Sequence, residues 1–452
     1  MGMLFILQGA PGCGKSTFIS EHNLEKYVVS PDAIRAMIIT DGTEVYDENR
    51  GAMIHGCDFS PNVSVMALSM AERMTSERMH RDETIIIDSV AAKRRNIAGI
   101  VRNAHRNAYD IHYVDMQEGL SLEDVLARNA GRGLRAVPAD VVETMYRRCR
   151  DYDLQKGEDR ISRDDMFAMM RLPELDFDGY KRVRVVGDVQ GCFGRLKEAG
   201  IVGLEHDPDT AVVFSGDMFD RGPDSEAGPL FDWLGDAVHA DNMHFVLGNH
   251  DNHIRYYAMD GMGRYGKATK TTISRILNDS AMVAHSTKKL ERLSRDIYRS
   301  MTPLLAFRYH GRHYVVTHGG LHPSIIDSAM DDGGVPGMAG ACATTGRTYR
   351  LGFISGQECW YGTGSFVGRG DYSMDIDTII EHDRTPMSPI QIHGHRNTHM
   401  HAPYEFKHTF NLETRVERED GSLSVLELDG ADPAYIHSYD GRTYRNGVLE
   451  HA

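Results

Sequence analysis

A glycine-rich run near the start of the chain has the residue types and spacing of a phosphate-binding loop. It reads Gly9-Ala-Pro-Gly-Cys-Gly-Lys-Ser16 and lies between a short apolar run and an expected helix. Glycines let successive backbone N–H groups face a phosphate, while the lysine and serine reach the terminal phosphates and Mg²⁺. The motif therefore predicts ATP or another NTP bound with Mg²⁺. The expected ligands are Gly9, Gly12, Gly14, Lys15, Ser16 and Thr17, with Ser16 holding the Mg²⁺.

Two carboxylates and an arginine follow expected strands of the same region, where open parallel sheets place their substrate loops. Asp32 comes after the apolar run at 27–29 and precedes Arg35 by three residues, and Asp88 follows the run at 84–87. A carboxylate there accepts the proton of an attacking hydroxyl, while an arginine binds an anion on the same substrate. We expect these roles for Asp32 and Arg35, and we expect Asp88 to hold Arg35 or water around the metal. The alternatives are a helix N-cap with a surface ion pair, and a strand-end turn.

Two arginines stand four residues apart on one face of an expected helix. They are Arg128 and Arg132, just before the segment 133–138. Arginines on a mobile segment stabilise the charge of a transferring phosphoryl group, so the pair predicts a lid over the NTP. The alternative is a solvated basic face.

Five segments farther along the chain each place hard-metal ligands directly after an apolar run. Mixed aspartate, asparagine and histidine ligation suits Mn²⁺, Ni²⁺, Fe²⁺ or Zn²⁺, and one carboxylate bridging two such ions gives the metal pair of phosphoester hydrolysis. The pattern therefore predicts a binuclear site, with Mn²⁺ or Ni²⁺ preferred. The segments are Gly187-Asp-Val-Gln-Gly191, Gly216-Asp-Met-Phe-Asp-Arg-Gly222, Gly248-Asn-His-Asp251, His318-Gly-Gly320 and Gly394-His395.

The motifs from the phosphate loop to Arg128-Asn-Ala-Gly-Arg132 resemble the 5′-OH polynucleotide kinase family over most of residues 1–150. The resemblance implies that Lys15 and Asp32 act in catalysis, with Asp32 as the general base. It implies that Arg35 binds the acceptor phosphate and that Arg132 is the lid arginine on the donor.

The five metal-ligand segments resemble the calcineurin-like metallophosphoesterases over roughly residues 182–430. The resemblance implies a first metal held by Asp188, Gln190 and Asp217, and a second held by Asp217, Asn249, His318 and His395. It further implies that Arg221 grips the phosphate and that His250, oriented by Asp251, stabilises or protonates the leaving oxygen. Most members carry histidine at the position of Gln190, although the symmetrical diadenosine tetraphosphate hydrolases tolerate glutamine. His393 is a further candidate ligand.

The pattern of strands and helices predicts an α/β protein with two domains. Short apolar runs alternate with helical stretches in the first 150 residues, which is typical of a parallel sheet. The helical stretch at 65–79 has Met66, Met70 and Met74 at i, i+4 spacing, which we interpret as core packing. Runs at 183–186, 212–214, 244–247, 314–316 and 389–392 predict an αβ sandwich. We expect a P-loop kinase domain at 1–155, a linker at 156–180, a metallophosphoesterase domain at 181–430 and a tail at 431–452.

Composition narrows the class of protein. Hydrophobic residues make up 41% of the 452 residues and charged residues 25%, which is typical of globular domains. The net charge of −15 is uneven, because residues 1–150 carry 18 Lys+Arg against 20 Asp+Glu, so the remainder carries 32 against 45. Carboxylates that bind metals belong to that excess, so acidity does not exclude a phosphate-bearing substrate. The six dispersed cysteines and the lack of a long apolar run predict a cytoplasmic protein without membrane contact.

The two resemblances together imply an enzyme that heals nucleic-acid ends. It would phosphorylate polynucleotide 5′-OH ends with an NTP and hydrolyse 3′-phosphates, with RNA the preferred substrate, DNA the other, and a separate ligase acting afterwards. The sequence does not predict the oligomeric state, and an oligomer is one possibility. One alternative is a small-molecule kinase fused to a dinucleoside polyphosphate hydrolase or a protein phosphatase, and another is a nucleotide-responsive scaffold with a decayed metal site.

Overall fold

The computed structural model describes residues 2–38, 44–47, 52–55, 61–81, 83–91, 93–107, 109–133, 136–260, 267–331, 347–350, 356–363, 366–368, 371–372, 375–396, 406–419, 421–430, 435–438, 443–445 and 448–451. The chain divides into two compact units, Met1–Met170 and Arg171–Ala452. No helix within the described ranges is long and apolar enough to cross a membrane.

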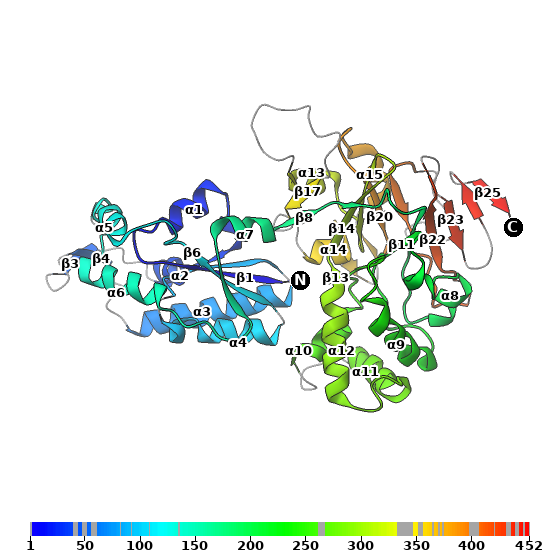
Figure 1. The fold of residues 1–452 in the computed structure, drawn as a ribbon, viewed down its shortest axis with the longest axis horizontal. Helices are drawn as coiled ribbons and strands as arrows, with labels where there is room; N and C mark the ends of the chain where they lie inside the picture. The colour runs from blue at the N-terminus through cyan, green and yellow to red at the C-terminus, as the bar shows by residue number, and fades with distance from the viewer. Residues whose placement is uncertain are drawn as a thin grey trace. The chain divides into compact units, whose positions relative to one another are not determined.

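The first unit is built on a parallel five-stranded sheet with the order β2-β5-β1-β6-β7 (Figure 1). Strands β1, β2, β5 and β6 confirm the four expected apolar runs, and the sheet confirms the α/β fold class. The bounds are β1 Met3–Gln8, β2 Val28–Val29, β5 Ile85–Asp88, β6 Asp110–Asp115 and β7 Glu158–Ile161. A separate hairpin joins β3 Glu44–Asp47 to β4 Ala52–His55.

Helices cover both faces of this sheet because successive side chains of a strand point to opposite faces. In β1, Leu4 and Ile6 pack into a core with α3 and α4, whereas Phe5 and Leu7 pack with α1 and α7. The helices are α1 Lys15–Glu21, α2 Pro31–Ile38, α3 Pro61–His80, α4 Ala98–Arg106, α5 Leu122–Ala130, α6 Ala139–Arg150 and α7 Arg163–Met169.

The methionine stripe of α3 does not pack in the core, so that interpretation was wrong. Met66, Met70 and Met74 are 52%, 44% and 41% exposed. The buried face lies one position farther along the helix, where Ala67 and Ala71 are fully buried. Small side chains allow α3 to approach its neighbours closely, so periodicity alone selected the wrong one of two adjacent faces.

The segment 156–180, expected as a linker, contains elements of the folded units. β7 pairs in parallel with β6, for example Val114 with Ile161. α7 begins at a capping box in which the Ser162 side chain accepts from Asp165 N–H. The polar residues that suggested a linker are helix-capping residues of α7 and exposed side chains of the edge strand β7.

The second unit contains two sheets that pack face to face. The larger has the order β13-β12-β11-β10-β22-β23-β24-β25 and the smaller β21-β20-β15-β14-β9. Their strands confirm the five expected runs. The larger sheet has β10 Arg182–Val186, β11 Thr210–Phe214, β12 Met243–Val246, β13 Met301–Thr302, β22 Ser424–Leu428, β23 Tyr435–Ser438, β24 Thr443–Arg445 and β25 Val448–His451. The smaller has β9 Leu175–Asp176, β14 Leu304–Tyr309, β15 Arg312–Thr317, β20 Ile390–His393 and β21 Thr409–Asn411.

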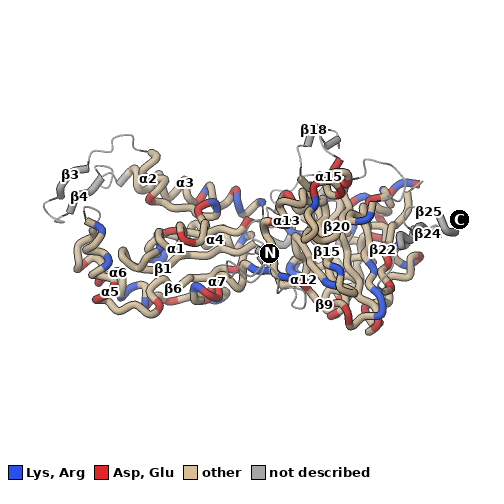
Figure 2. Tube along the Cα trace, turned by 90° about the horizontal axis from the view of Figure 1, so that it is seen from above, with Lys and Arg blue, Asp and Glu red and all other residues tan. Residues whose placement is uncertain are grey.

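Alternation along the strands builds one core between the sheets and another under the helices. Val183 and Val185 of β10 join Phe307 and Ile392 in the inter-sheet core, while Val186 faces the helical core. The helices of this unit are α8 Phe193–Glu198, α9 Ala227–Ala237, α10 Asn252–Asp260, α11 Lys267–Asp279, α12 Thr287–Ser300, α13 Pro323–Ala329, α14 Gly356–Tyr361 and α15 Ile376–Asp383. Acidic and basic residues are interspersed over both units (Figure 2).

Short strands occupy segments expected to lack them. The expected tail at 431–452 contains β23 to β25, which extend the larger sheet from β22 by antiparallel pairing. Residues 332–346 lie outside the described residues, and the segments that flank them contribute to a small sheet with β8. That sheet consists of β8 Arg171–Pro173, β16 Met330–Asp331 and β17 Thr348–Arg350, and a further hairpin pairs β18 Phe366–Gly368 with β19 Asp371–Tyr372.

Candidate functional site

The phosphate loop connects β1 to α1 and needs glycine for its backbone shape. Gly12 and Gly14 have φ of 95° and 92°, in the left-handed region that other residues rarely adopt. A Cβ at Gly12 would lie 2.5 Å from the backbone oxygen of Val125. Lys15 Nζ lies 2.6 Å from the carbonyl oxygen of Gly9, so the ammonium is held against the loop.

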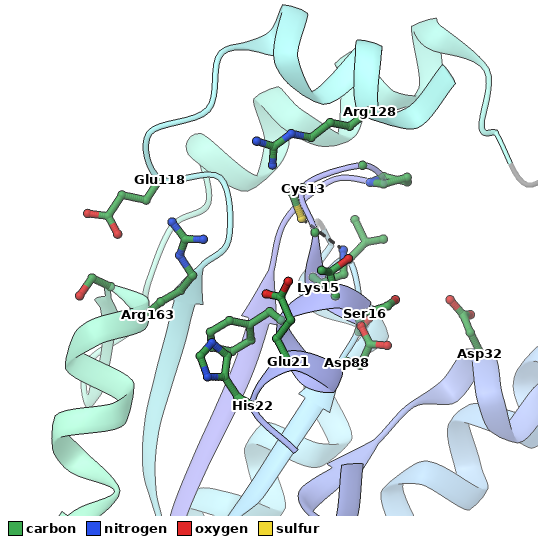
Figure 3. Close-up of a pocket in the computed structure, with 18 of the residues that line it drawn as sticks. Cys13, Lys15, Ser16, Glu21, His22, Asp32, Asp88, Glu118, Arg128 and Arg163 are labelled. Atoms are coloured by element: carbon green, nitrogen blue, oxygen red, sulfur yellow. Dashed lines mark hydrogen bonds between the residues drawn. The ribbon is translucent and has the colours of Figure 1, made fainter. Parts of the chain in front are cut away.

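A cavity of about 900 Å³ lies over the phosphate loop (Figure 3). It brings together nearly every residue predicted for the kinase chemistry from four separate parts of the sequence. The predicted residues in its lining are Gly12, Gly14, Lys15, Ser16, Thr17, Asp32, Asp88, Arg128 and Arg132. Gly9 lies beneath the loop, where a Cβ would be 2.6 Å from Cys13 Sγ.

The two predicted acceptor-side residues form an ion pair. Arg35 Nη1 lies 2.7 Å from Asp32 Oδ1, and the side chains are 20% and 77% exposed, respectively. Arg35 is not among the described residues that line the cavity. This ion pair is part of the alternative interpretation of the D-x-x-R pattern, and the exposed Asp32 carboxylate also borders the cavity.

Asp88 lies at the end of β5 beside Lys15. Burial raises the pKa of Asp88, and the Lys15 ammonium opposes that shift. Ser30 Oγ lies 3.5 Å from Asp88 Oδ2, so the ends of β2 and β5 are joined at the cavity. We therefore place Asp88 beside the phosphate loop, where it can hold water around a cation.

The cavity also has lining residues that the sequence analysis missed. Arg163 of α7 and His22, which follows α1, both line it (Figure 3). Phe167 of α7 also lines it, and the His22 and Phe167 ring centroids are 4.6 Å apart. The missed signal was β7: once 158–161 is recognised as a strand, the loop after it belongs at the ligand edge of the sheet.

In the second unit, predicted ligands from four strand ends converge. The ligand atoms of Asp217, His318 and His395 lie within 4.8 Å of one another. His318 Nε2 lies 3.3 Å from Asp217 Oδ1 and 3.0 Å from Asn249 Oδ1. His318 Nδ1 lies 3.0 Å from the carbonyl oxygen of Ser215, which leaves Nε2 facing the other ligands.

The backbone is strained where it presents these ligands. Gln190, Asp217 and His395 have φ of 51°, 53° and 62°. A Cβ at Gly394 would lie 1.9 Å from Asp188 Oδ1, and one at Gly248 would lie 2.2 Å from Asp217 Oδ1. Glycines flanking the ligands therefore let the carboxylates approach, and strained φ values of this kind cluster at functional sites.

The donor set fits the metals that the sequence predicts. Burial would raise the pKa of Asp217, but the neighbouring His318 and His250 hold it below its usual value, so its carboxylate is ionised. Gln190 Nε2 donates to Asp217 Oδ2 at 2.8 Å. The other amide atom, Oε1, is buried and has no hydrogen-bond partner among the described residues. A cation beside Asp217 would satisfy this oxygen.

His250 is oriented by Asp220 and not by Asp251, which corrects the expected arrangement. Asp220 Oδ2 lies 2.7 Å from His250 Nδ1. Asp251 instead accepts from three backbone N–H groups, those of Asp217, Met218 and Gly248, at 3.0, 2.8 and 2.8 Å. Asp251 therefore braces the two loops that carry the ligands.

Arg221 lies beside His250. Its Nη2 is 3.0 Å from His250 Nε2, and its side chain is half exposed. The further candidate ligand His393 is held elsewhere. Its Nε2 lies 2.9 Å from Asp377 Oδ1, and it does not belong to the metal-ligand cluster of the described residues.

Comparisons with known proteins agree with this division of the chain. Residues 4–151 match the family described as AAA domain, and residues 181–333 match calcineurin-like phosphoesterase. The chain thus joins a nucleotide-binding P-loop domain to a metallophosphoesterase domain that carries His/Asp metal-binding clusters.

Several solved phosphatase structures are similar to part of the chain. A cold-active protein-tyrosine phosphatase of a psychrophile Shewanella species is 16% identical with a TM-score of 0.36, and the match covers 60% of this chain and 83% of that one. A protein serine/threonine phosphatase from Saccharomyces cerevisiae is 16% identical with a TM-score of 0.35, covering 61% and 85%. No curated protein sequence matches the chain.

Proposed function

We propose that this protein heals broken polynucleotide ends. Its first unit transfers the γ-phosphate of ATP or another NTP to a 5′-OH, and its second removes a 3′-phosphate. RNA is the preferred substrate and DNA the other, a separate ligase seals the ends, and the reaction takes place in the cytoplasm. The observation that carries the proposal is that one cavity is lined by the phosphate loop, by the carboxylates Asp32 and Asp88, and by the arginines Arg128 and Arg132.

The kinase step follows from the groups around that cavity. The Asp32 carboxylate accepts the proton of the attacking 5′-OH, whose oxygen then bonds to the γ-phosphorus as the bond to the leaving ADP oxygen breaks. Lys15, Arg128 and Arg132 surround the phosphates with positive charge. Ser16 would hold the Mg²⁺ that accompanies the NTP.

The phosphatase step uses the second group of residues. Asp188, Gln190, Asp217, Asn249, His318 and His395 would hold two divalent metals, Mn²⁺ or Ni²⁺, which supply an activated water and neutralise phosphate charge. Arg221 binds a phosphate oxygen. His250 donates to Asp220 through Nδ1, and its Nε2 accepts from Arg221. When Arg221 turns to the phosphate, Nε2 is released, and in the protonated imidazolium it can pass its proton to the leaving 3′-oxygen.

End analysis of a defined RNA nick tests the proposal. The nick carries a 3′-phosphate and a 5′-OH and is incubated with the full chain, ATP, Mg²⁺ and Mn²⁺. We expect both a 5′-phosphate and a 3′-OH to form. Absence of 5′ phosphorylation with both an RNA and a DNA nick would overturn the kinase assignment.

The second candidate is a small-molecule kinase fused to a dinucleoside polyphosphate hydrolase or a protein phosphatase. Glutamine at position 190 favours it, because the symmetrical diadenosine tetraphosphate hydrolases tolerate glutamine where most metallophosphoesterases carry histidine. Competing nucleoside and oligonucleotide acceptors separate the two kinase functions, and diadenosine tetraphosphate, a phosphopeptide and a 3′-phosphorylated RNA separate the phosphatase functions.

A further inference from the structure

Two buried carboxylates meet at the edge of the predicted metal centre. Asp188 and Glu413 are 3% and 8% exposed, and their carboxylates lie close enough to interact with each other. Glu413 belongs to none of the five segments predicted to bind metal. It lies two residues after the end of β21, and Asp188 lies two residues after the end of β10.

The fold holds Glu413 in this place. Its backbone N–H donates to Asn411 Oδ1 at 3.1 Å, and its Oε1 accepts from the backbone N–H of Arg415. The loop before Asp188 packs closely against the same segment, since a Cβ at Gly187 would lie 2.3 Å from the carbonyl oxygen of Leu412. The proximity of the two carboxylates is therefore built into the backbone.

Two carboxylates in contact in a buried site repel each other unless a proton or a cation lies between them. A second observation favours a cation. Gln190 is 2% exposed, and its Oε1 has no hydrogen-bond partner among the described residues, while its Nε2 is fixed on Asp217. Gln190 is bonded to Asp217, and Asp188 interacts with both Glu413 and Asp217, so these residues offer oxygen donors only. Both ligand histidines instead belong to the cluster of Asp217, His318 and His395.

We propose that Glu413 is a ligand of the first metal and that this metal site is made of oxygen donors only, from Asp188, Gln190, Asp217 and Glu413. Oxygen ligands select hard cations such as Mg²⁺ and Mn²⁺, while the second site, with His318 and His395, accepts Mn²⁺, Ni²⁺ or Zn²⁺. The glutamate carboxylate thus adds a charged oxygen donor beside the neutral Gln190 amide. This inference rests on the phosphoesterase half of the proposed function.

Metal binding to the full chain tests the proposal without any substrate. Protein stripped with EDTA is titrated with Mn²⁺, and free Mn²⁺ is followed by its electron paramagnetic resonance signal. We expect two bound Mn²⁺ per wild-type chain. Glu413→Gln should weaken one of them at least tenfold and leave the other unchanged, whereas Glu419→Gln, an exposed residue of the same loop, should change neither.

Competition identifies which site is affected. Excess Mg²⁺ should displace one Mn²⁺ from the wild type, and the Mn²⁺ retained by Glu413→Gln should resist Mg²⁺ but yield to Zn²⁺. His395→Ala should show the opposite selectivity. If Glu413→Gln binds both Mn²⁺ with wild-type affinity, the carboxylates form only a proton-sharing pair and the proposal is wrong.

Glu413→Asp keeps the charge, but its shorter side chain places the carboxylate farther from the metal. It should therefore also weaken one bound Mn²⁺, and it replaces Glu413→Gln in the titration if that variant does not fold. Inactivity of the wild type on RNA ends would overturn the proposed substrate but not this metal assignment, because the titration requires no turnover.

Discussion

The carboxylate of Asp220 lies 2.7 Å from Nδ1 of His250. The contact fixes the imidazole so that Nε2 faces Arg221 at 3.0 Å. Thr272 Oγ1 donates to the other oxygen of Asp220 at 3.2 Å, and Arg275 donates to its backbone oxygen at 2.8 Å. Asp220 is therefore held by α11 while it orients His250, and it has a separate role from Asp251.

Asp220→Asn should impair leaving-group protonation. We expect kcat on phenyl phosphate to fall by about 10²-fold or more, and kcat on p-nitrophenyl phosphate to fall much less, because nitrophenolate leaves without a proton. Asp251→Asn should instead lower Tm and metal retention, since three backbone N–H groups lose a charged acceptor. Equal losses on both esters for Asp220→Asn would assign Asp220 a purely structural role.

The two chemical sites should be separable. Lys15→Ala or Asp32→Ala should abolish 5′ phosphorylation and leave 3′-phosphate release nearly intact, and Asp217→Ala should do the reverse, because each site is built from one compact unit. Both activities are measured on the same nicked RNA. Loss of both from one well-folded variant would contradict this prediction.

Arg35→Ala tests whether the ion pair with Asp32 gives way to an acceptor phosphate. If it does, kcat/KM for an oligonucleotide should fall, with a loss of transition-state stabilisation of about 2 to 5 kcal/mol. The kcat/KM for a nucleoside acceptor without an adjacent phosphate should change little. Equal losses on both acceptors at unchanged Tm would mean that Arg35 serves only to hold Asp32.

Gln190→His should tighten the first metal and raise activity on 2′,3′-cyclic phosphates and diesters, because imidazole is a stronger ligand than an amide and can donate a proton. The wild type should need added Mn²⁺ or Ni²⁺ at high micromolar to millimolar concentration and open cyclic phosphates poorly. The measurements are metal dependence and the ratio of diester to monoester turnover. An unchanged ratio and metal dependence would contradict the prediction.

His244 should make the second unit sensitive to acid. Burial lowers the pKa of His244 to about 4, against an ordinary value of 6.5. The unfolded chain therefore binds this proton more readily, and the free energy of unfolding should decrease as the pH falls from about 6.5 to 4, by on the order of 2 to 3 kcal/mol.

His244→Phe keeps an aromatic ring beside Phe177, whose centroid lies 5.0 Å from that of His244. Urea unfolding at pH 7.5 and pH 5 should show a smaller loss of stability in this variant than in the wild type. The same loss in both proteins would show that His244 does not carry the effect.

The sequence by itself determined the features whose chemistry is local. The phosphate loop and the five metal-ligand segments could be recognised because each chemical residue follows a buried strand directly, and parallel strands bring such residues to one edge. This placement of residues at strand ends also predicted that Lys15, Asp32 and Asp88 share a cavity and that Asp217, His318 and His395 form a cluster.

Only the tertiary structure decided which neighbours these residues have. Asp251 follows His250 directly in the sequence and Asp220 stands 30 positions before it, yet the strained turn after β11 and the position of α11 select Asp220. The exposure of Met70 depends on how closely α3 packs against its neighbours, which favours the adjacent alanines. Glu413 meets Asp188 across 225 positions of sequence because β21 and β10 end side by side in different sheets. Such contacts depend on backbone approach between distant segments, which no local pattern of residues encodes.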